Sequence, residues 1–126
     1  MERMVGPLMQ IVIADRHAEV RSALRLLLEN IDASWSVIAE VADLKGLQAC
    51  GNLKDADLVL LEWSLPGLGN VTPAEKLKNI HRGSKSRIVV LGSCFDERDR
   101  AQTAGVDGFI SKIESPEQVI SVLREL

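Results

Sequence analysis

The feature that most constrains the fold of this chain is a regular alternation of short apolar runs with stretches of helical spacing. Each apolar run is nearly continuous, which is typical of strands buried on both faces of a parallel sheet. Strands that alternate with helices predict a sheet covered by helices on both sides. The predicted strands are 10–14, 35–42, 57–62, 87–91 and 107–111.

Helix signals occupy the segments between and after these runs. Two capping boxes with proline at the first helical position predict helix starts at Thr72 and Ser115. Right-handed crossovers leave few topologies, and strand order 2-1-3-4-5 is favoured, as in a flavodoxin-like, doubly wound α/β fold. The predicted helices run from about Val20 to Ile31, from Asp43 to about Cys50, from Thr72 to about Arg82, from Asp96 to Ala104 and from Ser115 to Leu126.

Length and composition predict one globular domain. The 126 residues are 46% hydrophobic and 26% charged, and no apolar stretch approaches the ~18 residues of a membrane span. A net charge of −3 argues against direct nucleic-acid binding, which favours a basic face. We expect residues 1–9 to be a disordered lead-in, residues 10–126 to form the domain, and the location to be cytoplasmic. Two lone cysteines and two lone histidines give no metal-ligand spacing.

Charged residues follow three of the predicted strands. Asp15 and Arg16 follow the first strand, Glu62 closes the third, and Lys112 follows the fifth. In the order 2-1-3-4-5 the winding direction switches between strands one and three, and sites form at the carboxyl ends of strands at such a point. We therefore expect Asp15, Arg16 and Glu62 to meet there, with Lys112 reaching in.

From Gln10 to Leu126 the chain resembles the receiver domain of bacterial two-component response regulators. Each matching segment is weak alone, but all occur in order at the right spacing. The chain is most similar to receivers that precede helix-turn-helix output domains, because His17 follows the first strand and Ser115-Pro116 follows Lys112. The segments are Ile-Val-Ile-Ala-Asp15-Arg16-His17, Leu-Val-Leu-Leu-Glu62-Trp-Ser-Leu-Pro66-Gly, Arg-Ile-Val-Val-Leu-Gly92-Ser93 and Ala-Gly-Val-Asp-Gly108-Phe109-Ile-Ser-Lys112.

The resemblance implies roles for three residues that keep the family pattern. Two adjacent acids after strand one hold Mg²⁺ in the family, and Asp15 matches the first of them. Lys112 matches the lysine that contacts the phosphoryl group. Phe109 matches the aromatic residue of strand five that reports the change to the partner face, although it lacks a phenol hydroxyl.

Three positions depart from the family pattern. Arg16 replaces the second acid, Glu62 replaces the phosphoacceptor aspartate, and Gly92 replaces the Thr or Ser that contacts the phosphoryl group. At ~4 Å and an effective dielectric near 20, each unit of like charge repels a cation by roughly 4 kcal/mol. We expect Mg²⁺ binding to be lost or very weak, and a salt bridge from Arg16 to Glu62 or Asp15 to take its place.

The sequence leaves simpler interpretations open. Glu62 could be a solvated loop carboxylate, and Arg16 and Lys112 could be ordinary surface residues. Phe109 could be core without a switching role, and Gly92 could serve only a tight turn. Trp63, which follows Glu62, is predicted to be a partly exposed loop aromatic that could cover the site or mark a contact surface.

The favoured interpretation is a degenerate receiver that signals without phosphorylation and is not an enzyme. Its expected partners are its own output domain or a histidine kinase, with a possible homodimer through the 96–126 face. One alternative is a working phosphoacceptor that is phosphorylated by a histidine kinase. Another is a nucleotide- or flavin-binding module, although no glycine-rich phosphate loop follows strand one.

Overall fold

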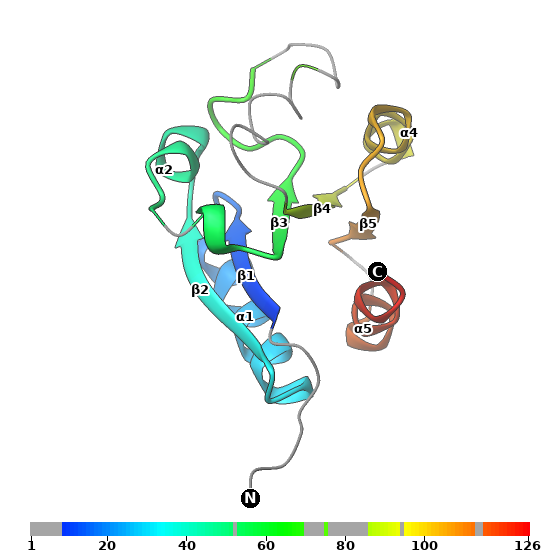
Figure 1. The fold of residues 1–126 in the computed structure, drawn as a ribbon. Coiled ribbons are helices and arrows are strands. Elements are labelled where there is room, and N and C mark those ends of the chain that lie inside the picture. The colour runs from blue at the N-terminus through cyan, green and yellow to red at the C-terminus, as the bar shows by residue number, and fades with distance from the viewer. Residues whose placement is uncertain (1–8, 52, 70–74, 76–85, 94, 113–114) are drawn as a thin grey trace, which may run out of the picture.

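The computed structural model describes residues 9–51, 53–69, 75, 86–93, 95–112 and 115–126. Five parallel strands form one sheet in the order β2-β1-β3-β4-β5, which confirms the predicted flavodoxin-like topology (Figure 1). The strands are β1 (Met9–Ala14), β2 (Trp35–Val41), β3 (Leu58–Glu62), β4 (Arg87–Gly92) and β5 (Gly108–Ser111).

Each predicted strand is present, and its ends lie within one residue of the prediction. β1 and β3 form the centre of the sheet, where Ile11 pairs with Leu58 and Ala14 with Leu61. All five residues of β3 are buried, because helices cover both faces of a parallel sheet. The carboxyl ends of β1 and β3 therefore lie side by side, at the predicted switch point.

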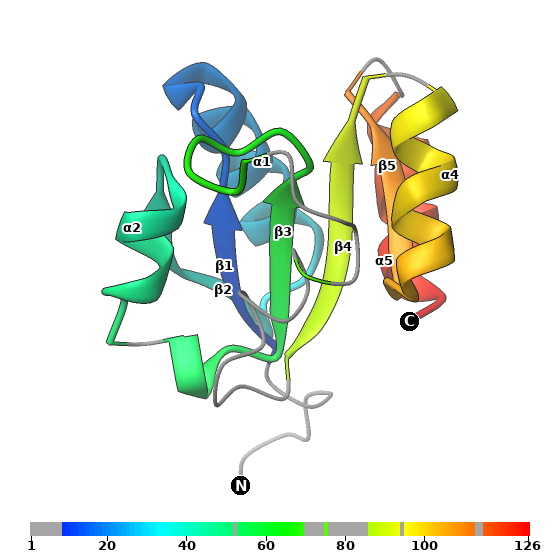
Figure 2. The same ribbon diagram turned by 90° about the horizontal axis from the view of Figure 1, so that it is seen from above.

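The helices lie in two layers, one on each face of the sheet (Figures 1 and 2). One face packs against α1 and α5, through residues such as Leu28 and Leu123. The other packs against α2 and α4, through residues such as Leu47 and Ala101. The helices are α1 (Ala18–Ile31), α2 (Leu44–Gln48), the 3₁₀ turn η1 (Leu53–Asp55), α4 (Phe95–Ala104) and α5 (Pro116–Arg124).

Local sequence signals explain where several helices begin and end. Asp43 caps α2 by accepting the N–H of Gly46 at 2.7 Å, and Ser115 caps α5 by accepting the N–H of Gln118 at 3.3 Å. Gly105 adopts a φ of 92° after α4, a conformation that favours glycine. Apart from Glu75, the helix predicted from Thr72 lies outside the described residues, as do residues 1–8.

The structure corrects the expectation for Trp63. This side chain was predicted to be partly exposed, but only 2% of it is accessible. Its backbone N–H donates to the carbonyl of Leu91 at 3.0 Å, and Leu65 and Leu68 are buried in the same core. The segment after Glu62 therefore folds back onto the sheet, so Trp63 forms part of the core and not an open contact surface.

No helix in the described part of the chain is long and apolar enough to cross a bilayer.

Candidate functional site

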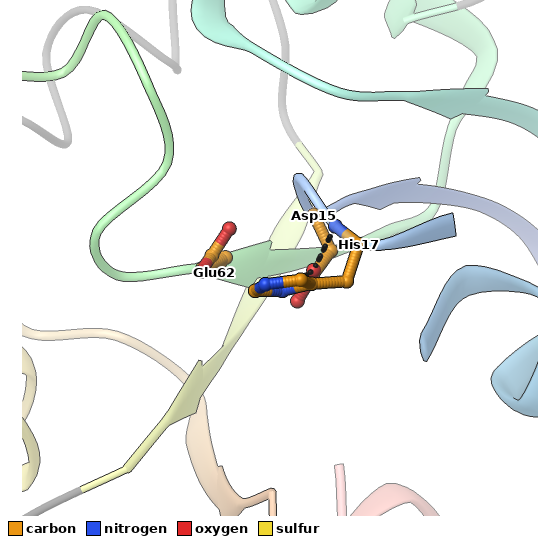
Figure 3. A group of neighbouring side chains, drawn as sticks. All are labelled: Asp15, His17 and Glu62. Carbon is orange, nitrogen blue, oxygen red and sulfur yellow. Dashed lines mark hydrogen bonds and ion pairs between the residues drawn. The ribbon is translucent and has the colours of Figure 1, made fainter. Parts of the chain in front are cut away.

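The carboxyl ends of β1 and β3 bring two buried carboxylates together. Asp15 follows β1 and is fully buried, and Glu62 ends β3 with 4% of its surface exposed. Figure 3 shows both side chains at the same edge of the sheet, with His17 beside them. Glu62 is therefore not the solvated loop carboxylate that the sequence had left open.

The backbone after β1 is held by contacts on both sides. The N–H of Asp15 donates to the carbonyl of Val41 in β2 at 3.0 Å. From α1, Arg21 donates to the carbonyl of Asp15 at 2.6 Å and pairs with Glu40 at 3.3 Å. These contacts fix the direction in which Asp15 and Arg16 leave the strand.

Asp15 makes a different contact with each carboxylate oxygen. Its Oδ1 accepts the backbone N–H of His17 at 2.8 Å and lies 3.3 Å from Nδ1 of the same residue. Its Oδ2 lies 2.9 Å from the Nζ of Lys112, which reaches in from the end of β5. The predicted meeting of Asp15 and Lys112 is thus present, with the lysine as the counter-charge of a fully buried aspartate.

Glu62 is contacted by both cations of the site. Its Oε1 accepts the backbone N–H of Arg16 at 2.9 Å, and the guanidinium Nε lies 3.3 Å from Oε2. Lys112 Nζ donates to the same Oε2 at 3.2 Å. A second guanidinium nitrogen donates to the carbonyl of Ser64. Arg16 therefore links the loop after β1 to the end of β3, and it pairs with Glu62 while Asp15 pairs with Lys112.

The charges of the site balance. Two carboxylates, Asp15 and Glu62, lie within ion-pair distance of two cations, Arg16 and Lys112. Lys112 contacts both acids and is 21% exposed, whereas Arg16 covers the outer side and is 43% exposed. Buried charges are stable only when they are paired, and the ion pairs of this network all come from within the chain.

The network shifts the pKa values of two of its members. Burial raises the pKa of Glu62, but the N–H of Arg16 and the ammonium of Lys112 outweigh burial and hold the pKa of this carboxyl below its ordinary value of 4.5. Burial lowers the pKa of Lys112, but Asp15 and Glu62 outweigh it and raise that pKa above the ordinary 10.5. Both groups are therefore charged at neutral pH.

These shifts predict an acid-sensitive fold. A carboxyl whose pKa is lowered by folding stabilises the protein above 4.5, and this stabilisation is lost as the pH falls through the folded pKa. We expect the free energy of unfolding, measured by urea titration, to fall below pH 4.5, and to fall less steeply in Glu62→Gln. The exposed Glu117→Gln is the matched control and should follow the wild-type curve. Parallel curves for the wild type and Glu62→Gln would contradict the role of Glu62.

His17 is a site residue that sequence reasoning missed. Asp15, His17 and Glu62 each offer an atom, and these atoms all lie within 4.8 Å of one another, a spacing that could hold a metal ion. The lone histidines of the sequence had suggested no ligand set. The available signal was the position of His17 two residues after Asp15, because the backbone there turns its side chain back toward the carboxylate.

Gly92 and Phe109 lie next to the charged network. Gly92 ends β4, and its carbonyl accepts the N–H of Lys112 at 2.9 Å. The backbone of Gly92 is not in the positive-φ region, unlike that of Gly67, Gly69 and Gly105. A positive φ is therefore not the reason for glycine at this position. Phe109 is 8% exposed and packs in the core beneath α4.

The fold and the order of these site residues define the class of protein. Residues 11–124 match the response regulator receiver domain, so the chain belongs to this family of two-component signalling domains. It is 26% identical over 115 residues to the nitrate/nitrite response regulator protein NarP of Escherichia coli K12, an alignment that covers 91% of this chain and 53% of NarP. The chain spans about half the length of the curated relatives that it matches.

Solved structures show the same fold. A LuxR-family two-component response regulator from Aurantimonas sp. SI85-9A1 aligns with a TM-score of 0.78 at 24% identity, covering 94% of this chain and 84% of that one. RcsB, solved as two dimers bound to two parallel DNAs, aligns with a TM-score of 0.80 at 24% identity, covering 94% and 63%. At this identity the likeness concerns the architecture alone.

Proposed function

We propose that this chain is an atypical receiver domain that regulates a partner without Mg²⁺ and without phosphorylation. The observation that carries the proposal is the contact of Arg16 with Glu62 through both its backbone N–H and its guanidinium. In the family an acid at the position of Arg16 helps to hold the metal ion. Here a cation of the chain itself contacts the carboxylate at the phosphoacceptor position.

The residues of the site do not fit Mg²⁺. This ion requires near-octahedral oxygen ligands, usually one or two carboxylates together with waters. Both carboxylates of the site already contact a cation, because Lys112 lies 2.9 Å from Asp15 and Arg16 lies 3.3 Å from Glu62. The third neighbour, His17, offers a nitrogen, which suits Zn²⁺ and similar metals better than Mg²⁺. An added divalent ion would have to displace at least one of the three ion pairs that Arg16 and Lys112 make with the two acids.

Glu62 is also poorly placed to accept a phosphoryl group. Its carboxylate is nearly buried and held by Arg16 and Lys112, so an incoming phosphodonor would have to displace the guanidinium. Its extra methylene, relative to aspartate, moves the reacting oxygen by about an ångström, which can cost roughly 10²-fold in rate. Gly92 supplies no hydroxyl for a phosphoryl oxygen. These three features act in the same direction.

The test is incubation with acetyl phosphate and Mg²⁺, followed by intact mass measurement. We expect no phosphate adduct on the wild type. A typical receiver with both acids and the aspartate, treated in parallel, controls for the donor. A stoichiometric adduct that maps to Glu62 would support the alternative function, a working phosphoacceptor that is phosphorylated by a histidine kinase.

Partners follow from the proposed function. The relatives are about twice as long as this chain, and RcsB was solved as DNA-bound dimers. By analogy, this domain controls an output domain or binds a histidine kinase, and a homodimer would use the face of residues 96–126. The net charge of −3 supports the expectation that this domain does not itself bind nucleic acid.

A further inference from the structure

β2 is an edge strand of the sheet, with β1 on one side and no strand on the other (Figure 1). The outer side of an edge strand presents N–H and C=O groups that a strand of another molecule can pair with. Here side chains of α1 occupy both backbone groups of Val37. Its N–H donates to Oε2 of Glu29 at 3.1 Å, and its carbonyl accepts from Nη2 of Arg25 at 3.0 Å. The edge of β2 is therefore covered at this residue.

The pairing of β2 with β1 is irregular directly after Val37. Ile11 of β1 pairs with Val37, but the next residue, Val12, pairs with Ala39. Ile38 is therefore an extra residue in β2, which is the arrangement of a β-bulge. A bulge bends and twists the strand, so a bulged edge is a poorer template for another strand. The covered residue and the bulge lie next to each other.

The two covering side chains are held in place by their neighbours. Arg25 and Glu29 lie four residues apart on α1, so both project from the same side of the helix. The Nε of Arg25 lies 3.1 Å from Oε2 of Glu40 in β2, and the Nε of Arg21 lies 3.3 Å from Oε1 of the same carboxylate. Arg25 therefore contacts β2 at two points, its ion pair with Glu40 and its hydrogen bond to Val37.

We propose that Arg25 and Glu29 seal a latent interface on β2, through which a second copy of this chain would otherwise pair. A two-fold axis would set the two β2 edges antiparallel, so the same surface of each copy would meet its partner. The N–H and C=O of Val37 would then find partners across the axis in place of Glu29 and Arg25. β2 lies at the opposite end of the sheet from β5, so this interface is distinct from the face of residues 96–126.

The first test is the exchange rate of the Val37 amide, measured by nuclear magnetic resonance on a dilute sample. We expect Glu29→Ala to raise this rate about fivefold, because the amide loses its acceptor. Glu29→Gln is the matched control, since its amide oxygen can still accept the N–H, and its rate should stay within about twofold of the wild type. A wild-type rate in Glu29→Ala would contradict the seal.

The second test is self-association of Arg25→Ala with Glu29→Ala, measured by sedimentation across an about hundredfold range of protein concentration. We expect this double variant to associate at least about tenfold more tightly than the wild type, and the Val37 amide to regain protection as the concentration rises. Glu19→Ala with Arg124→Ala is the matched control. It also removes one exposed acid and one exposed base, and it should associate as the wild type does.

Two results would overturn the latent interface. One is a double variant that associates no more tightly than the wild type. The other is a dimer in which the Val37 amide exchanges as fast as in the dilute sample, because its contact then lies elsewhere. If the double variant does not fold, Glu29→Ala alone is judged by the same two results. A phosphate adduct on Glu62 would refute the proposed function and leave these outcomes unchanged, because the seal lies outside the acidic pocket.

Discussion

Lys112→Met is expected to lower the free energy of unfolding at pH 7 by about 3–5 kcal/mol. Lys112 lies 2.9 Å from Oδ2 of Asp15 and 3.2 Å from Oε2 of Glu62. Methionine preserves much of the side-chain volume but removes the charge. Asp15, which is fully buried, would then hold an uncompensated negative charge beside that of Glu62. Urea unfolding followed by circular dichroism measures the loss.

The control for this prediction is Lys54→Met in η1. Lys54 is exposed, so its replacement should change the free energy of unfolding by no more than about 0.5 kcal/mol. A loss below about 1 kcal/mol in Lys112→Met would place its ion pairs among solvent-screened surface contacts, whose contribution is of that size. The description of a buried, charge-balanced site would then be wrong.

The double substitution Arg16→Asp with Glu62→Asp is expected to create a Mg²⁺-dependent rise in melting temperature. It removes the guanidinium, places a carboxylate after Asp15, and shortens the side chain at the end of β3. These changes supply the carboxylate oxygens that Mg²⁺ prefers. With Mg²⁺ at ten times its dissociation constant, ligand binding would stabilise the folded state by about 1.4 kcal/mol, which is several degrees.

Glu62→Asp alone is the matched control for the double substitution. It shortens the carboxylate but leaves Arg16 in place, so we expect no Mg²⁺-dependent shift. A shift of equal size in Glu62→Asp would show that side-chain length, and not the guanidinium, excludes the ion. Scanning fluorimetry with and without millimolar Mg²⁺ compares the two variants directly.

Much of the fold and the meeting of the charged residues could be predicted from sequence. Strand ends follow from apolar runs, and once the order 2-1-3-4-5 is chosen, the ends of β1 and β3 must be neighbours. That geometry brings Asp15 and Glu62 together whatever their rotamers. The expected salt bridge from Arg16 therefore needed only a side chain long enough to reach.

Other features depend on packing that sequence patterns do not encode. Trp63 follows a charged residue and precedes a Pro/Gly-containing loop, which resembles an exposed segment, yet tertiary contacts with β4 bury it. His17 joins the site because the turn after β1 directs its backbone N–H and its ring toward Asp15, two residues earlier. The ring of Phe109 fills the space beside Gly92, a close approach that no sequence pattern indicates.

Isothermal titration of the wild-type protein with Mg²⁺ tests the central claim most directly. If Arg16 and Lys112 already neutralise both carboxylates, the titration should show no saturable heat at any concentration up to the millimolar range. A saturable, stoichiometric Mg²⁺ binding curve that Asp15→Asn abolishes would contradict the account.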